Sequence, residues 1–364
     1  MRLAHFVCAL AGLGTVTAAP PAVDSAQPMR RTVFGLSPLF PDVHCTANSE
    51  VCQVITGEAE INAATTISSL VASPLFDLTK TYFFIAGIAG VNPNIATVGS
   101  VSFARYAVQV ALQFEIDARE IPSNFSTGYF PIGSVAPNQH PKDIYGTEVF
   151  EFNDDLKKLA VGFASTAKLN DSDASIAYRA NYAQAAAKAG PTVVECDVAT
   201  ADAWFSGELL GDAFSNTTKL LTNGTGVYCA TAQEDNATAE ALLRAALHKK
   251  VDFGRIILMR TFSDFDRPYP GESVLQNLVY SNPQFFTPSI VNLYLAGVKV
   301  VEGILGHWDT TFEGGVTPTN YIGDILGSLG GTPDFGPGKS VEPLPLSTLR
   351  KRNVRRNFRR QLSA

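Results

Sequence analysis

Residues 54–90 read VITGEAEINAATTISSLVASPLFDLTKTYFFIAGIAG, which places two apolar runs, each ending in glycine, around one amphipathic segment. A buried strand that turns on glycine and returns through a helix to a second buried strand is a βαβ unit with its ligand-facing ends open. The stretch therefore predicts an α/β fold with a pocket for a small molecule.

The length and composition favour one large domain. The chain has 364 residues, 46% of them hydrophobic, which is enough to bury a sizeable core. We interpret residues 1–19 as a signal peptide, with Arg2, an apolar core over residues 3–16 and small residues at 17–19. An internal membrane helix is the alternative, but this apolar stretch is too short to span a bilayer. We therefore expect a secretory route and an extracellular or cell-surface location.

Both ends of the expected domain, residues 36–345, differ from it in composition. Residues 20–35 include several prolines and the dibasic pair Arg30-Arg31, so we interpret them as a propeptide or linker. Residues 346–364 form a basic tail that we expect to be disordered, although a role at an anionic surface is the alternative. The net charge of −6 gives no indication of nucleic-acid binding.

The cysteines and glycosylation signals agree with secretion. Removal of Cys8 with the signal peptide leaves four cysteines, and an even number predicts two disulfides. Pairing Cys45 with Cys52 and Cys196 with Cys229 is one of three connectivities, and buried free thiols are the alternative. The N-x-S/T acceptor pattern occurs at five positions. They are Asn124, Asn170, Asn216, Asn223 and Asn236.

Strand-like and helix-like patterns alternate along the chain, which favours α/β over a segregated α+β fold. Strands are expected at residues 51–56, 80–86, 98–104, 107–114, 147–152, 192–196, 226–231 and 255–260. Helices are expected at 62–71, 154–168, 172–188, 237–250 and 289–307, with Asn153 as an N-cap. Residues 317–345 are expected to form an irregular arm.

Two glycine turns mark the expected pocket. Gly57 ends the first apolar run, and the small residues after Asn62 let the following helix pack closely on the sheet. Gly87 and Gly90 repeat this arrangement in the next run. Adjacent glycine-ended strands are where open α/β sheets bind ligands.

Four segments resemble the purine nucleoside permease family, which is similar in turn to nucleoside phosphorylases and nucleosidases. They read VITGEAEINAATTISSL, YFFIAGIAGVNPNIATVGSVSFARY, TNGTGVYCATAQEDNATAEAL and ILMRTFSDFDRPYPGE. The resemblance runs in order from about Gly35 to the mid-300s. It implies a three-layer α/β/α domain with a central mixed sheet, and a site that binds purine nucleosides.

The resemblance implies three kinds of site residue. Glu234, in Gln233-Glu234-Asp235, takes the place of the acid that holds the ribose hydroxyls, although a carboxylate at a helix N-terminus is also an ordinary dipole partner. Trp204 or Phe205 takes the place of the aromatic that stacks on the base, although an aromatic after a strand is more often part of the core.

Asp264 takes the place of the general acid that protonates purine N7. Cleavage of an N-glycosidic bond puts negative charge on the base, so a nearby acid with a raised pKa suits the reaction. In the alternative interpretation, Asp264 and Asp266 pair with Arg260 or Arg267 and only hold a loop.

Three features depart from the family pattern. No strand-like run lies between the expected signal peptide and Phe34, so the first strand, with its acidic residue, is apparently missing. The turn at Gly87–Gly90 carries Ile88 rather than an anion-holding hydroxyl, and Arg105, after the following strand, could partly substitute. The segment Gly99-Ser100-Val101 also lacks an acid that relatives carry.

These features lead to three functional hypotheses. The first is a purine nucleoside permease family protein that binds nucleosides and serves their uptake with a membrane transporter, because a chain without a membrane helix forms no path itself. The second is an extracellular nucleosidase or phosphorylase, with hydrolysis favoured over phosphorolysis. The third is an inactive truncated member. The five histidines form no spaced cluster, so neither a metal nor another cofactor is expected, and the resemblance allows a homo-oligomer.

Overall fold

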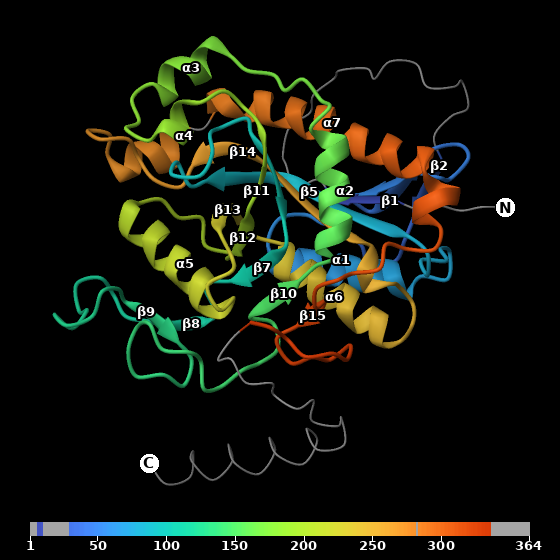
Figure 1. The fold of residues 1–364 in the computed structure, drawn as a ribbon, viewed down its shortest axis with the longest axis horizontal. Helices are drawn as coiled ribbons and strands as arrows, with labels where there is room; N and C mark the ends of the chain where they lie inside the picture. Colours follow the sequence, from blue (N-terminus) through green and yellow to red (C-terminus); the bar gives the residue numbers. More distant parts are fainter. Residues whose placement is uncertain (1–5, 10–28, 282, 336–364) are drawn as a thin grey trace, which may run out of the picture.

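The protein is described by a computed structural model that covers residues 6–9, 29–281 and 283–335 (Figure 1). The predicted basic tail and most of the predicted signal peptide lie outside these residues. The strands are β1 (Phe6–Ala9), β2 (Met29–Thr32), β3 (Asp42–Cys45), β4 (Cys52–Val54), β5 (Tyr82–Val91), β6 (Val101–Ala104), β7 (Tyr106–Gln109), β8 (Gln113–Glu115), β9 (Tyr129–Pro131), β10 (Val149–Glu151), β11 (Val193–Glu195), β12 (Asp197–Thr200), β13 (Tyr228–Ala232), β14 (Ile256–Phe265) and β15 (Gly323–Asp324). The helices are α1 (Glu60–Ala72), α2 (Asp154–Ala164), α3 (Asp173–Arg179), α4 (Ala185–Lys188), α5 (Glu208–Leu221), α6 (Asp235–Leu247) and α7 (Pro283–Gly306).

The central sheet is mixed, which confirms the predicted fold class. Its main path runs β15-β10-β7-β12-β13-β5-β1-β4-β3-β2, and β14 also pairs with β5. β14 lies parallel to β5 and antiparallel to β6. β5 therefore lies at the centre of the sheet, and its last residue, Val91, meets β13.

Strand β5 is buried on both faces, so it reads as a continuous apolar run rather than an alternating one. Phe83 and Ile85 belong to a core cluster that also includes residues of α1 and α6. Tyr82 and Phe84 point to the opposite face and pack with residues of α2 and α7. The sheet is thus covered on both faces, with α7 along the upper part of Figure 1 and α1 and α6 below it.

Helix α7 is the most apolar of the described helices. By length and composition its segment Phe285–Gly306, with a mean hydropathy of 1.4, could span a membrane, but core helices of soluble proteins pass the same test. Leu293, Ala296 and Val300 are buried against the sheet and α2. This packing is that of a core helix.

The expectation that no strand lies between the signal peptide and Phe34 is wrong, because β2 lies there. β2 and β3 form an antiparallel pair at the sheet edge, and β1 lies between β4 and β5 and is parallel to both. The sequence of residues 54–90 suggested that β4 and β5 are neighbours. They are not, because β1 lies between them. Because β2 alternates between half-buried and exposed positions, it lacks an apolar run. β2 lies within the segment predicted to be a linker, and β1 within the predicted signal peptide; both assignments stay predictions.

Other expected elements form with altered bounds. The N-cap of α2 is Asn153, whose side chain accepts a hydrogen bond from the Leu156 N–H at 3.1 Å. The helix expected over 172–188 is instead two short helices, α3 and α4. The strand expected over 107–114 is divided between β7 and β8, and α5 was not predicted.

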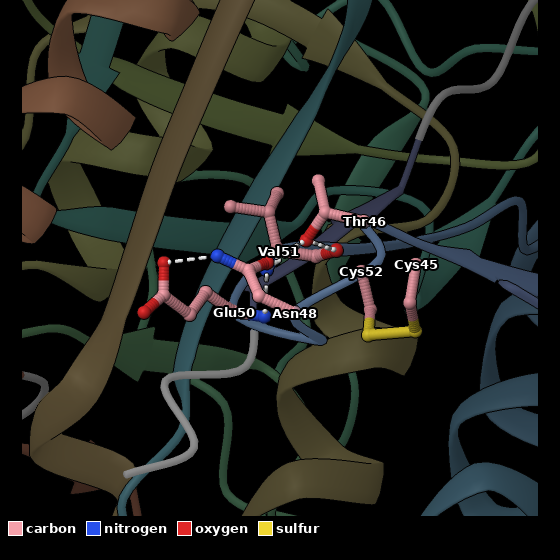
Figure 2. The surroundings of a disulfide bond; sticks show 6 residues. All are labelled: Cys45, Thr46, Asn48, Glu50, Val51 and Cys52. Carbon is pink, nitrogen blue, oxygen red and sulfur yellow. Dashed lines mark hydrogen bonds between the residues drawn. A yellow bond between two sulfur atoms is a disulfide. The ribbon is translucent and has the colours of Figure 1, made fainter. Parts of the chain in front are cut away.

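Two disulfides cross-link strands of the central sheet. Cys45–Cys52 joins β3 to β4 across a hairpin that is also closed by the Thr46 N–H, which donates to the Val51 carbonyl at 2.8 Å (Figure 2). Cys196–Cys229 joins the junction of β11 and β12 to β13.

One of the five predicted glycosylation asparagines, Asn236, is buried. Its side chain is 2% exposed and donates to the Thr147 carbonyl, so it is not accessible in the folded chain.

Candidate nucleoside site

A cavity of about 180 Å³ lies where several chain turns meet at the ends of β5, β13 and β14. A larger hollow, of about 810 Å³, runs along the exposed face of α1 but is lined by small and apolar side chains without a charged group. The smaller cavity instead combines carboxylates with aromatic rings, so it is the better candidate for a site. Its lining residues are Glu58, Ile88, Ala89, Gly90, Ala201, Ala203, Trp204, Phe205, Thr231, Ala232, Gln233, Glu234, Ser263, Asp264 and Phe286.

Asp264 enters the cavity because β14 is irregular at this point. The pairing register of β14 with β5 shifts between Phe262 and Asp264, which leaves Ser263 as an extra residue. Such bulges re-aim side chains next to functional sites. Asp264 then lies opposite Gly90, where a Cβ atom would come within 2.8 Å of both Asp264 Oδ2 and Thr231 Oγ1. Only glycine leaves this space open.

The Asp264 carboxyl group is buried and has no cationic partner among the described residues. It accepts a hydrogen bond from the Ser263 hydroxyl, which donates to Oδ1 at 2.8 Å. Burial raises the pKa of Asp264 to about 6, while the Ser263 hydrogen bond opposes the shift and the Asp266 charge adds to it. Asp264 is thus able to carry a proton near neutral pH.

The arginines that could have paired with Asp264 have other partners. Arg267 binds Asp266 and Asp212, with its Nη1 2.7 Å from Asp212 Oδ1. Arg260 Nε donates to Asp235 at 3.1 Å, and its Nη2 lies 3.1 Å from Glu234 Oε2. The loop-holding interpretation therefore fits Asp266 but not Asp264.

Glu234 is oriented by a buried arginine. Its side chain makes no capping bond to α6; Oε2 faces Arg260 and Oε1 accepts the Ala59 N–H at 3.2 Å. Burial raises the pKa of Glu234, and the Arg260 charge opposes this. Arg260 also donates to the Ile88 carbonyl at 3.1 Å. One buried guanidinium thus connects the ends of β5 and β13.

Aromatic rings line the cavity from two elements. Trp204 is 58% exposed, whereas Phe205 packs edge-on against Phe214 with ring centroids 4.7 Å apart. Phe286, near the start of α7, is a third ring that the sequence did not indicate. The loop that carries Trp204 is held by Asp202, whose Oδ1 accepts the Glu60 N–H at 2.8 Å.

Three predicted binding residues lie behind the lining rather than in it. Gly57 has a φ of 81°, so it supplies the left-handed turn after β4. Asn62 Nδ2 donates to the Glu58 carbonyl at 2.7 Å and fixes the same turn. Gly87 lies within β5, paired with Arg260. Their direct contact with a ligand stays a prediction.

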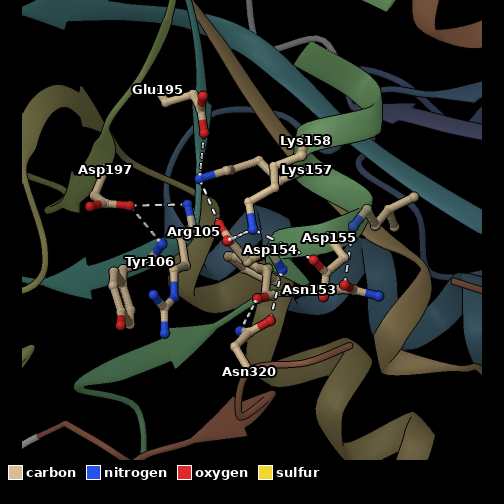
Figure 3. A network of polar contacts seen from close by, with 12 residues as sticks. Arg105, Tyr106, Asn153, Asp154, Asp155, Lys157, Lys158, Glu195, Asp197 and Asn320 are labelled. Carbon is tan, nitrogen blue, oxygen red and sulfur yellow. Dashed lines mark hydrogen bonds and ion pairs between the residues drawn. The ribbon is translucent and has the colours of Figure 1, made fainter. Parts of the chain in front are cut away.

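No lysine, arginine or histidine is among the described residues that line the cavity. Arg105, considered above as a partial substitute for the missing anion-binding group, is not among the described residues that line the cavity. Arg105 Nε donates to Glu151 at 2.7 Å. Its backbone N–H donates to Asp197 at 3.0 Å, within the network of Figure 3. The carboxylates Glu58, Glu234 and Asp264 instead make the cavity acidic, which opposes the binding of a phosphate ion.

A family model described as purine nucleoside permease matches residues 23–317. The chain belongs to this family. A purine nucleoside permease of Candida albicans is 47% identical over 311 residues, covering 84% of this chain and 77% of the relative. A probable purine nucleoside permease of Schizosaccharomyces pombe is 41% identical over 285 residues, covering 76% of this chain and 82% of the relative. The predicted family is confirmed.

Solved structures show the same fold at low sequence identity. The Helicobacter pylori 5'-methylthioadenosine/S-adenosylhomocysteine nucleosidase, solved with butyl-thio-DADMe-Immucillin-A, is 12% identical and has a TM-score of 0.51. The match covers 83% of this chain and 100% of the nucleosidase chain. A second structure of this enzyme gives a TM-score of 0.52 at 13% identity. The predicted nucleoside-phosphorylase-like fold is thereby confirmed.

Proposed function

We propose that this permease family member binds purine nucleosides in the cavity at the ends of β5, β13 and β14. The observation that carries the proposal is the position of Asp264, which is buried in the cavity, has no cationic partner in the described part of the chain and is able to hold a proton toward a purine nitrogen. Trp204 and Phe205 supply faces on which a base can stack. The names of the curated relatives, purine nucleoside permease, support the same class of ligand.

The sugar is assigned to the side of the cavity at Glu234. A buried carboxylate held by Arg260 accepts two ribose hydroxyls without moving, and it discriminates against sugars that lack them. The chain would deliver the nucleoside to a membrane transporter after secretion. Secretion, the transporter and a homo-oligomeric state are parts of the proposal that rest on the sequence.

A second candidate function is hydrolysis of the N-glycosidic bond. The raised pKa of Asp264 favours it, because a carboxylic acid that is partly protonated near neutral pH is able to protonate the leaving base. Phosphorolysis is disfavoured, since no cationic side chain lines the described cavity.

Two measurements on the purified chain test these functions. Equilibrium dialysis with adenosine, guanosine and inosine is expected to show saturable binding of at least one of them. Chromatography of the same mixtures, with and without phosphate, separates binding from cleavage. Bound nucleoside without free base supports binding alone, whereas free base in both mixtures supports hydrolysis. Base formed only with phosphate would contradict our account of the acidic cavity, and no binding would overturn the proposed function.

A further inference from the structure

The three carboxylates of the cavity differ in what they bind. Glu234 is held by Arg260 and the Ala59 N–H, and Asp264 accepts a hydrogen bond from Ser263. The side chain of Glu58 is exposed, and no hydrogen bond or ion pair of its carboxylate is found in the described part of the chain. Its acceptor oxygens are therefore available to a ligand.

The backbone holds Glu58 at the cavity wall. The residues on either side have positive φ angles, 81° at Gly57 and 74° at Ala59, and a positive φ is strained for alanine. Asn62 binds the Glu58 carbonyl, and the Ala59 N–H binds Glu234. The Ala59 bond joins this turn to Glu234, the carboxylate that we assign to the ribose, and Glu58 lines the same cavity.

We propose that Glu58 selects uncharged nucleosides over nucleotides, by accepting a hydrogen bond from a sugar hydroxyl and repelling a phosphate attached to the sugar. This inference rests on the proposed function. A phosphomonoester carries about −1.5 to −2 charges near pH 7. At a few ångströms from a carboxylate such a group is strongly disfavoured, and no cation lines the described cavity to offset the repulsion.

Isothermal titration calorimetry tests this selection with adenosine, guanosine, inosine and their 5'-monophosphates. We expect the wild type to bind a monophosphate at least about tenfold more weakly than the matching nucleoside. Glu58→Gln is expected to reduce that ratio about fivefold or more while nucleoside affinity changes by less than about fivefold. Glu120→Gln makes the same charge change on an exposed loop outside the cavity and should leave the ratio unchanged.

Salt gives an independent measure. Because Glu58 is exposed, salt should screen its repulsion of a phosphate. Raising the ionic strength from about 0.05 M to about 0.5 M should therefore reduce the ratio of nucleoside affinity to monophosphate affinity in the wild type, and should reduce it less in Glu58→Gln. Equal wild-type affinity for nucleoside and monophosphate, or a ratio unaltered by Glu58→Gln, would overturn the role of Glu58. A wild type that binds none of the three nucleosides would instead overturn the proposed function.

Discussion

At the residue scale, the protonation of Asp264 would make the rate of base release depend on pH. Its folded pKa of about 6 lies above its ordinary value of 3.8, so its protonated fraction falls as the pH rises through about 6. If the chain releases base from nucleosides, the rate is expected to fall above pH 6. Asp264→Asn should lower the rate by about 10²–10⁴-fold and change nucleoside affinity by less than about tenfold. Initial rates between pH 5 and 8, with calorimetry of the variant, check this. A rate that rises with pH, or an equal loss of rate and affinity, would contradict the assignment.

Arg260 is the cation that pairs with the buried carboxylates Glu234 and Asp235, and the stability of this buried cluster depends on it. Arg260→Met would leave Glu234 and Asp235 buried without their cation, and breaking a buried pair costs about 3–5 kcal/mol of unfolding free energy. Lys299→Met removes an exposed pair with Glu302 on α7 and should cost less than about 1 kcal/mol. Urea unfolding of both variants makes the comparison. Similar costs for the two would show that the buried cluster contributes no more than a surface pair.

The sequence indicated part of the site because part of it lies in short motifs. Glu234 lies two residues after β13 and Asp264 lies near the end of β14, and the resemblance marks both. Phe286 lies outside the segments that carry the resemblance, and the fold alone brings it to the cavity. The pairing of Arg260 with Glu234 could not be predicted from the sequence either, because the two positions differ by 26 and several acids were available.

At the element scale, the disulfides should contribute unequally to stability. In the loop-entropy view, the Cys196–Cys229 bond, with a separation of 33 residues, constrains the unfolded chain more than Cys45–Cys52, with a separation of 7. Replacing the first pair with alanines should cost about 1–1.5 kcal/mol more unfolding free energy than replacing the second. Denaturant unfolding of the two double variants measures this difference. A larger cost for the Cys45–Cys52 pair would show that strain or packing outweighs loop entropy.

Elements were predictable where burial dominates the local sequence. β14 is buried along its whole length and β5 at every position except Ile88, so both appeared as apolar runs, although each extends further than expected. α5 was missed because Gly211 and several Ser, Asn and Thr residues lower its helix propensity. Gly211 is nonetheless required, since a Cβ there would clash with the Arg267 guanidinium. Tertiary packing overrides propensity at such positions.

At the scale of the whole molecule, the fold brings the chain turns after β4 and β12 and the ends of β5, β13 and β14 to one small acidic cavity. The core clusters on either side of the sheet are apolar, and α7 adds Phe286 to the cavity lining. Membership of the family and the shared fold follow from the comparisons, and nucleoside binding is the function that this cavity supports best.

The most direct test of nucleoside binding is calorimetry of Gly90→Ala with adenosine, guanosine and inosine. A Cβ at Gly90 would come 2.8 Å from Asp264 Oδ2, whereas a Cβ at Gly162, on α2, would meet no atom within 4 Å, so Gly162→Ala serves as the control. We expect the wild type and Gly162→Ala to bind the nucleosides alike and Gly90→Ala to bind them at least about tenfold more weakly, because a misplaced site group is costly. Undiminished binding by Gly90→Ala would place the nucleoside elsewhere and contradict the account.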